Sequence, residues 1–358
     1  MKKTNNILAS FCVSLALCGC SESEINNEPE SVEIAISPSV HKDSRGLDPI
    51  TNLSLTNIGI YAGHTLPGAK FDINDIVANS ALNNIKFTKD ESGVWHGNPP
   101  QYWPLGGTLS LFAYTPYDAS VVPSDDYTSG MLKVLFSPIS GDVTYQTDFC
   151  TSKPVLNQKY SSSIPIEFGH RLSQIMFYAN YDGSLPNPGF YLKIDKITLK
   201  NIIGTKYLVY KAEDPYFEWS DDAMFSGDQY RAEYSITRGS SQQIADNKLP
   251  KISDSPDGVQ LTMVNGRLYL LPQKISGENI LEFSYSWNFL SGSNETKIAQ
   301  FAEIVNLPES LWTPSKVVKY IISIHLGESS KINVTYEDGG WIEDWQDSGN
   351  TPPITDLI

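Results

Sequence analysis

The chain has 358 residues and a formal net charge of −15, which argues against a nucleic-acid partner because such a chain repels phosphate backbones. Its length is sufficient for two domains of the usual size, each with its own hydrophobic core. The four cysteines show no zinc-type spacing and no disulfide framework. Cys150 stands alone beyond residue 20, and we expect it to be a small buried apolar residue.

The N-terminus has the layout of an export signal. Two lysines are followed by an apolar run over residues 7–19, which spans roughly 20 Å as a helix and is too short for a bilayer core of about 30 Å. LCGC at residues 17–20 resembles the bacterial lipobox, so we expect cleavage before Cys20 and a lipid on its thiol. The acidic SESE at residues 21–24 resembles the surface-export signal of Bacteroidales lipoproteins. An ordinary secreted protein, cut near the same point, is the alternative.

Short strands with alternating apolar residues recur through the first half of the chain. Val32, Ile34 and Ile36 share one face of the first expected strand. Residues 109–114 are nearly all apolar, which predicts a central strand, and DESG at residues 90–93 predicts a hairpin turn. The expected elements of this half are strands at residues 31–40, 55–62, 84–95 (a hairpin), 109–114 and 132–136, and one short helix near residues 72–82.

The second half repeats the pattern. NG at residues 265–266 is a strong hairpin signal. The expected strands are residues 173–181, 191–200, 259–271 (a hairpin), 280–289, 299–305, 317–325 and 331–336. Strands at this spacing, in a chain with 25 Gly and 22 Pro, predict an all-β protein built as a pair of β-sandwiches.

Motifs for catalysis or cofactor binding are missing from the sequence. It contains no H-E-x-x-H, nucleophile elbow, phosphate loop or dinucleotide fingerprint. The acidic pairs at residues 125–126 and 221–222 have side chains suited to calcium binding or glycoside cleavage, but solvated loops commonly carry such pairs. Trp95, Tyr102 and Trp103 are close in sequence, so a sugar-binding platform is an alternative to packing in the core or rim. We therefore expect no enzyme, no cofactor and no metal.

Five short phrases resemble, in order, segments of the fimbrillin family, the fimbrial subunits of Bacteroidales. A proline in the last phrase stands where the family usually has glycine. The phrases are IGIYA at residues 58–62, YWP at 102–104 followed by LFAYTP at 111–116, FGHRLS at 168–173, LLPQ at 270–273, and WTP at 312–314 followed by the strand at 317–324. Together they span about residues 55–345.

The resemblance implies two tandem transthyretin-like β-sandwich domains in an exported surface lipoprotein. It also implies assembly by strand exchange. A protease cuts after an Arg or Lys in the loop behind the first strand, that strand leaves, and a strand of another subunit fills the groove, pairing with its backbone and filling its apolar pockets. In this chain the removable strand would be the one with Val32, Ile34 and Ile36.

The processing and donor segments follow from the same resemblance. Arg45, followed by Gly46 in a polar loop, is the expected cleavage position, and Lys42 is its rival. The C-terminal tail, residues 346–358, contains two prolines that cannot donate to a strand ladder, so it makes a poor donor. The hairpin at residues 317–336 is another donor, or the subunit accepts a strand and offers none. The subunit would then belong to the stalk, to the tip or, if uncut, to the anchor.

These expectations combine into one assignment. The chain is expected to be a structural subunit of outer-membrane fimbriae, held by a lipid such as palmitate on Cys20 and serving adhesion. Its partners would be other fimbrial subunits, the processing protease and a host or bacterial surface receptor. The alternative is a non-polymerising surface lipoprotein that binds glycans or a host protein. The expected segments are a signal peptide at residues 1–19, a lipidated segment with the removable strand at 20–45, an N-terminal β-sandwich at 46–162 and a C-terminal β-sandwich at 163–358.

Overall fold

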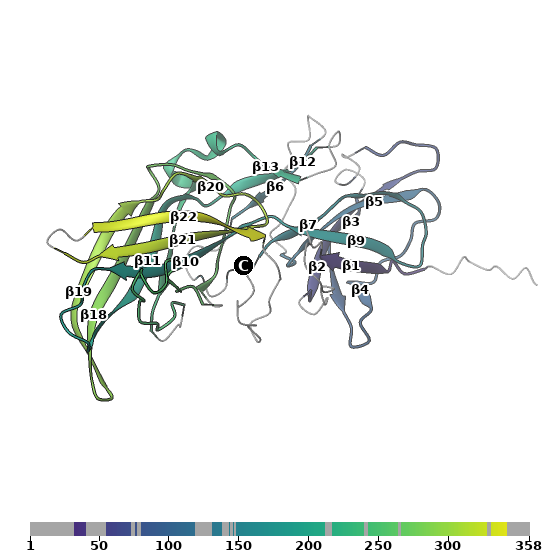
Figure 1. Ribbon diagram of the computed structural model, residues 1–358. Coiled ribbons are helices and arrows are strands. Elements are labelled where there is room, and N and C mark those ends of the chain that lie inside the picture. The colour runs from purple at the N-terminus through teal and green to yellow at the C-terminus, as the bar shows by residue number, and fades with distance from the viewer. Residues whose placement is uncertain are drawn as a thin grey trace, which may run out of the picture. The chain divides into compact units, whose positions relative to one another are not determined.

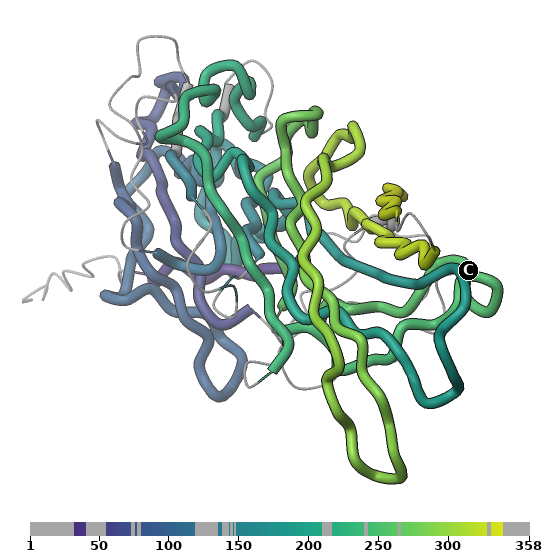
Figure 2. Tube along the Cα trace, turned by 90° about the vertical axis from the view of Figure 1, so that its left-hand side faces the viewer, coloured from purple at the N-terminus to yellow at the C-terminus, as the bar shows by residue number. Residues whose placement is uncertain are grey.

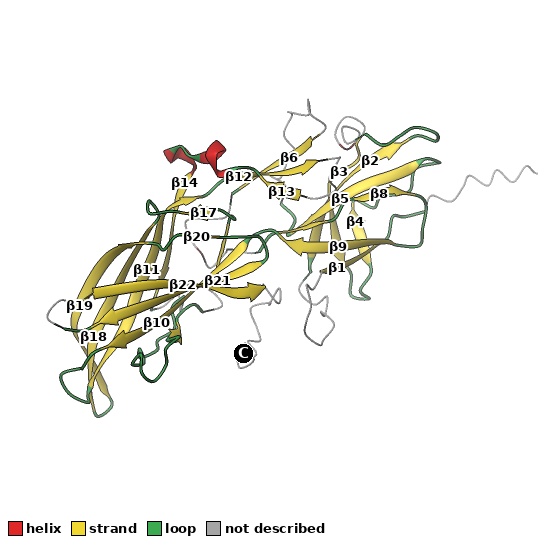
Figure 3. Ribbon diagram, turned by 45° about the horizontal axis from the view of Figure 1, so that its top comes forward, coloured by secondary structure: helices red, strands yellow, loops and turns green. Residues whose placement is uncertain are grey.

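The computed structural model describes residues 32–40, 55–72, 76, 80–118, 131–137, 143, 146, 148–211, 217–239, 243–263, 266–327 and 331–341. Residues Glu33–Ile358 form one compact unit, and of the other unit, Met1–Val32, the description includes only Val32. Strands dominate the described part of the chain, in agreement with the all-β expectation (Figure 3). Two short 3-10 helices, η2 (Asp222–Phe225) and η3 (Asp228–Tyr230), precede β14. No described helix has the length and apolar character needed to cross a bilayer.

The first half of the chain forms one large sheet of eight strands. Hydrogen bonds join seven of them, all labelled in Figure 1, in the order β1-β9-β7-β5-β2-β3-β4. The eighth strand, β8, pairs with β5. The strands are β1 (Ile36–Val40), β2 (Asn57–Thr65), β3 (Ser80–Lys89), β4 (Trp95–Asn98), β5 (Thr108–Thr115), β7 (Cys150–Ser152), β8 (Val155–Gln158) and β9 (Ile164–His170). The expected central position of β5 is confirmed, because β2 lies on one side of it and β7 and β8 on the other.

This sheet encloses its own apolar core. The core takes side chains from β1, β2, β3, β4, β5, β7 and β9, and β1 also lies close to β4 although the two are opposite ends of the pairing order. The first half is therefore one continuous hydrogen-bonded sheet whose two ends approach each other. Gly59 in β2 is required by the close approach of Tyr114 in β5, since a Cβ at Gly59 would lie 2.3 Å from the Tyr114 ring.

Two sheets of the second half pack as a sandwich. One has the order β15-β10-β21-β22, with β16 also paired to β10, and the other has the order β14-β11-β18-β19. Inward side chains of both sheets form one core that includes Phe177, Phe283 and Trp312. The strands are β10 (Ser173–Asp182), β11 (Phe190–Ile203), β14 (Arg231–Thr237), β15 (Val259–Gln260), β16 (Leu268–Leu270), β18 (Ile280–Ser291), β19 (Asn294–Asn306), β21 (Lys316–His325) and β22 (Lys331–Trp341). Figure 2 shows β18 and β19 as a long hairpin.

Two small sheets complete the described structure. One has the order β13-β12-β6, so β6 from the first half pairs with a strand of the second half. A third apolar cluster joins Tyr61 and Phe112 of the first half to Leu208, Phe217 and Tyr269 of the second. The strands are β6 (Met131–Phe136), β12 (Lys206–Lys211), β13 (Phe217–Trp219), β17 (Lys274–Ile275) and β20 (Ser310–Leu311), the last two of which pair with each other.

One local prediction was wrong. Residues 259–271 do not form a hairpin around NG, because β15 and β16 each pair with β10 and not with each other. Of the helix expected near residues 72–82, Ile76 is helical, residues 73–75 and 77–79 lie outside the described residues, and strand β3 replaces the expected helix from Ser80 onward. The hairpins β3–β4 and β21–β22 are confirmed, and β18 and β19 also form a hairpin. Strand β9, which the expected boundary at residues 162/163 assigns to the second half, pairs with β1 and β7 of the first.

Candidate functional site

The first described strand lies along β9. β1 pairs with β9 in parallel, from Ile36 opposite Ile164 to Val40 opposite Phe168 (Figure 1). The Ile164 amide donates to the Ala35 carbonyl at 2.9 Å, which extends the contact by one residue beyond β1. Two parallel neighbouring strands need a long connection between them. Here the chain between β1 and β9, which includes the other strands of the first sheet, supplies that connection.

The residues before β1 contact the other end of the sheet. The Ile34 amide donates to the Gln101 carbonyl at 2.7 Å, and Glu33 forms an antiparallel bridge with Tyr102, just after β4. Residues 33–40 thus lie between β9 and the backbone that follows β4. Without them, both backbones would lose hydrogen-bond partners in the place where the sheet ends approach each other.

Alternate side chains of this segment enter the core of the first sheet. Ile34 is 1% exposed and Ile36 is 5% exposed, and both belong to the apolar cluster inside the sheet. Val32, expected on the same face, is 41% exposed. Pro38 is buried and Val40 packs partly against the same cluster, so the buried positions begin at Ile34 and continue toward the end of β1.

A histidine also holds the start of the segment. His96 in β4 places Nδ1 3.1 Å from Glu33 Oε1 and Nε2 3.3 Å from Asp90 Oδ2. The pKa of His96 is raised above its ordinary value of 6.5, and the hydrogen bond with Glu33 contributes most to this rise. The pKa of Asp90 is lowered, mainly by the hydrogen bond from the Ser92 side chain and next by the one from the Val94 amide, so the Asp90 carboxylate stays charged.

The His96 contact should depend on pH. A group whose pKa is raised on folding contributes stability that is fully present below the unfolded pKa of about 6.5 and is lost as pH rises through the folded pKa. We expect His96→Gln to destabilise the protein more at pH 5.5 than at pH 8.5, as measured by urea denaturation. We also expect Glu33→Gln to lower the His96 titration midpoint in NMR more than Asp90→Asn does. An unchanged midpoint in both variants would contradict the contact.

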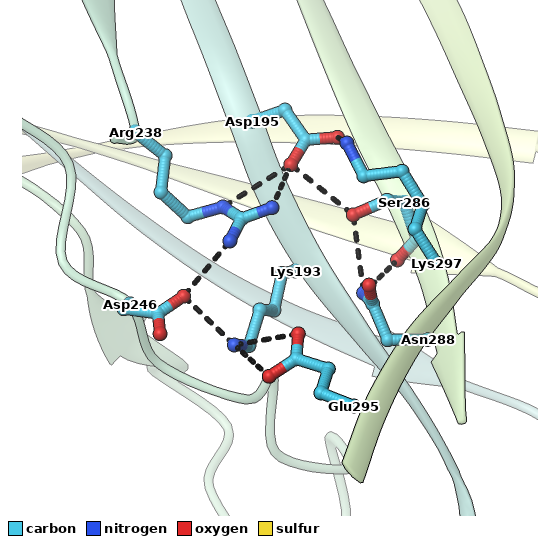
Figure 4. A network of polar contacts seen from close by, with 8 residues as sticks. All are labelled: Lys193, Asp195, Arg238, Asp246, Ser286, Asn288, Glu295 and Lys297. Carbon is cyan, nitrogen blue, oxygen red and sulfur yellow. Dashed lines mark hydrogen bonds and ion pairs between the residues drawn. The ribbon is translucent and has the colours of Figure 1, made fainter. Parts of the chain in front are cut away.

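A polar network covers the outer side of the β11–β18–β19 sheet (Figure 4). Lys193 contacts Asp246 at 2.8 Å and Glu295 at 3.0 Å, and Arg238 joins Asp246 to Asp195. Burial lowers the pKa of Lys193, but its two carboxylate partners outweigh this and raise it. Three cations face three carboxylates, since Lys297 also bonds Asp195. Each charge has an opposite partner, so the network stabilises the sheet and leaves no poised acid or base.

The acidic pair at residues 221–222 has structural roles. Asp221 accepts a hydrogen bond from the Ala223 amide at 2.9 Å and caps η2. Asp222 contacts the buried Lys206 ammonium at 2.5 Å. The pair at residues 125–126 lies outside the described residues. The described pair therefore offers neither a calcium site nor the two carboxylates of a glycosidase.

A second buried cluster joins three side chains with metal-ligand chemistry. Asp148, Cys150 and His170 are each at most 6% exposed. His170 Nδ1 shares a hydrogen bond with Asp148 Oδ2 and lies 3.5 Å from Cys150 Sγ. Burial, followed by the charge of Asp148, raises the pKa of the Cys150 thiol. The expected burial of Cys150 is confirmed, but no local pattern in the sequence indicates its neighbours in space.

The aromatic residues that suggested a sugar platform separate in the structure. Trp95 is 5% exposed and belongs to the core of the first sheet. Tyr102 is 51% exposed, and Trp103 meets the exposed Tyr160 edge to face at 5.9 Å. Only part of the expected set is therefore presented to solvent.

Comparison with known proteins decides the family. The sequence matches the fimbrillin-like family over residues 51–345. The chain belongs to the fimbrillin-like family. Fimbrillin-like proteins are structural and adhesion proteins of fimbriae, which confirms the expectation that this chain is not an enzyme. No curated protein sequence matches it.

Solved structures share the fold of this fimbrillin-like chain. A fimbrial protein from Bacteroides vulgatus superposes with a TM-score of 0.60 at 17% identity, over 86% of this chain and 99% of that chain. A candidate cell adhesion protein from Bacteroides ovatus superposes with a TM-score of 0.51 at 13% identity, over 88% and 99%. At these identities the likeness concerns the fold alone.

Some of the predicted site residues belong to the described part of the chain, and others do not. Ile34 and Ile36 are brought together with β9, while Cys20, Arg45 and Gly46 lie outside the described residues. The contact of His96 with Glu33 was missed, because two charged residues far apart in sequence carry no local signal. The backbone partners of Ile34 and Glu33 after β4 were missed for the same reason.

Proposed function

We propose that this fimbrillin-like chain is a lipid-anchored subunit of cell-surface fimbriae that assembles by proteolysis-triggered strand exchange and serves adhesion. In this proposal Cys20 carries the lipid, the chain folds as two transthyretin-like domains, and its partners are other fimbrial subunits, a processing protease and a surface receptor. The observation that carries it is the place of residues 33–40 between β9 and the backbone after β4.

The geometry of that segment suits a removable strand. Its first buried side chains, Ile34 and Ile36, fill the core of the first sheet, and each contributes roughly 1.5–3 kcal/mol by burial. Departure of the segment would expose apolar pockets and the unpaired edge of β9 together. An incoming strand with alternating apolar residues restores both, which is the physical basis of strand addition.

The connection after β1 supplies the switch in this proposal. Residues 41–54 separate β1 from the described part that leads into β2, and they contain Lys42, Arg45 and Gly46. A cut after Arg45 ends the covalent link between β1 and the sheet. The strand is then held only by noncovalent contacts, so a donor strand present at high local concentration can replace it.

The experiment compares Arg45→Ala with Lys42→Ala as the matched control. Each form is isolated from cell surfaces and from sheared fimbriae, and its intact mass and N-terminal sequence are measured. We expect the wild type and Lys42→Ala to give a fimbrial form that starts at Gly46. We expect Arg45→Ala to fold normally, retain the lipidated N-terminus at Cys20 and be absent from fimbriae.

Two other results would change the proposal. Normal incorporation of Arg45→Ala would remove Arg45 as the switch, and loss of incorporation in Lys42→Ala alone would transfer that role to Lys42. A single lipidated form that keeps residues 33–40 in the wild type would indicate an anchor or a subunit that does not polymerise. The position of the subunit in the fibre follows from which of these forms is found.

A second function, surface binding of glycans or host protein without polymerisation, rests on the exposed aromatic residues. Tyr102 is 51% exposed and Tyr160 is 64% exposed, beside the ring of Trp103. Such faces suit the apolar faces of sugars. The burial of Trp95 removes one member of the set, so this function is the weaker of the two.

A further inference from the structure

We propose that Asp148, Cys150 and His170 form a zinc site inside the first sheet. Strand pairing brings them together. Cys150 in β7 is directly opposite His170 in β9, and Asp148 precedes Cys150 by two residues. Side chains two apart in an extended chain point the same way, so the carboxylate and the thiol approach the same imidazole.

The two separations from the Cys150 sulfur are close to those of a zinc centre, whereas His170 Nδ1 and Asp148 Oδ2, which share a hydrogen bond, would move apart to admit the ion. Zinc bonds of about 2.0–2.3 Å at tetrahedral angles place ligand atoms about 3.3–3.8 Å apart. Cys150 Sγ lies 3.5 Å from His170 Nδ1 and 4.0 Å from Asp148 Oδ2, and all three ligand atoms lie within 4.8 Å of one another. Zinc would take the place of the hydrogen between His170 Nδ1 and Asp148 Oδ2.

Charge also favours a divalent ion over a monovalent one. Cys150 as thiolate and Asp148 as carboxylate carry two negative charges, and neutral His170 carries its remaining proton on Nε2. Zn²⁺ neutralises this set, which matters because an unbalanced charge is costly at sites only 0–6% exposed. Thiolate and imidazole ligands select zinc over magnesium or calcium. Three protein ligands leave the fourth tetrahedral position to a water.

The ion would fasten β9 to β7. β9 is the strand along which β1 lies, and the backbone beyond His170 runs directly into β10 of the second half. A zinc site there would hold the acceptor edge in place whether or not residues 33–40 are present. The inference therefore does not depend on strand exchange.

The test uses the mature protein purified from cells and the same protein refolded with ZnCl₂ or CoCl₂ after chelation. We expect one zinc per chain by elemental analysis, and with cobalt a thiolate charge-transfer band and the visible bands of a tetrahedral ion. Zinc at a hundredfold excess over its Kd should raise Tm by about 3 °C or more.

Two variants and one control separate the site from other binding. Cys150→Ala should lose the cobalt thiolate band. Asp148→Asn keeps an oxygen that accepts from His170, so it should fold and bind zinc at least tenfold more weakly. His96→Gln removes a histidine that faces two carboxylates but no thiol, and it should bind like the wild type.

Two results would overturn the zinc site. The first is a wild type that, when refolded with metal, contains no zinc and shows no thiolate band. The second is zinc binding that is equal in the wild type and Cys150→Ala. Either result would leave the cluster as a hydrogen-bonded contact between β7 and β9.

Discussion

Ile34→Ala and Ile36→Ala should each lower the free energy of unfolding by about 2–4 kcal/mol, because each removes buried side-chain volume from the core of the first sheet. The double variant should lose about 4–7 kcal/mol, with some departure from additivity because both side chains belong to one cluster. Urea denaturation of the uncleaved protein measures these changes. The loss should be accompanied by faster hydrogen exchange of the Ile164 amide, which donates to the Ala35 carbonyl.

Val32→Ala is the matched control for these variants. Val32 directly precedes residues 33–40 and is on the face that the sequence predicts as apolar, but it is 41% exposed. Its replacement should change stability by less than about 0.5 kcal/mol and leave the Ile164 amide protected. Equal effects of Val32→Ala and Ile34→Ala would contradict the packing of residues 33–40 and would remove the main support for a removable strand.

The strands of this protein could be predicted because strand formation depends on patterns among residues that are close in sequence. Alternation in residues 31–40 and the apolar run at 109–114 indicate burial on one face or on both, and the structure places Ile34, Ile36 and β5 accordingly. The turn at residues 90–93 also depends on neighbouring residues, and its hairpin forms. Composition and these patterns therefore indicated the all-β class.

The pairing of the strands could not be predicted because it depends on contacts between residues that are far apart in sequence. NG at residues 265–266 favours a hairpin locally, but β15 and β16 each bond to β10, whose backbone offers partners to both. The parallel pairing of β1 with β9 and the approach of β1 to β4 depend on closure of the whole first sheet. The contacts of His96 with Glu33, and of Cys150 with His170, exist only after that closure.

Trp312→Ala should lower the free energy of unfolding by about 3–5 kcal/mol, the range for loss of a large buried aromatic side chain. Trp312 is 1% exposed within the sandwich core, and its Nε1 donates to the Tyr320 hydroxyl at 2.9 Å. Burial raises the pKa of Tyr320 to about 12, so its hydroxyl stays neutral across the working range. Tyr320→Phe leaves the indole N–H without this acceptor and should cost about 1–3 kcal/mol.

A double-mutant cycle tests whether the indole and the hydroxyl act as one unit. Trp312→Phe removes the donor, so adding Tyr320→Phe to it should cost less than Tyr320→Phe costs alone. Leu311→Ala is the neighbouring control, because Leu311 is 59% exposed, and its effect should stay within about 0.5 kcal/mol. Calorimetry and urea denaturation measure all four variants. Additive losses would show that Trp312 contributes by packing alone, and a large loss in Leu311→Ala would contradict its exposed position.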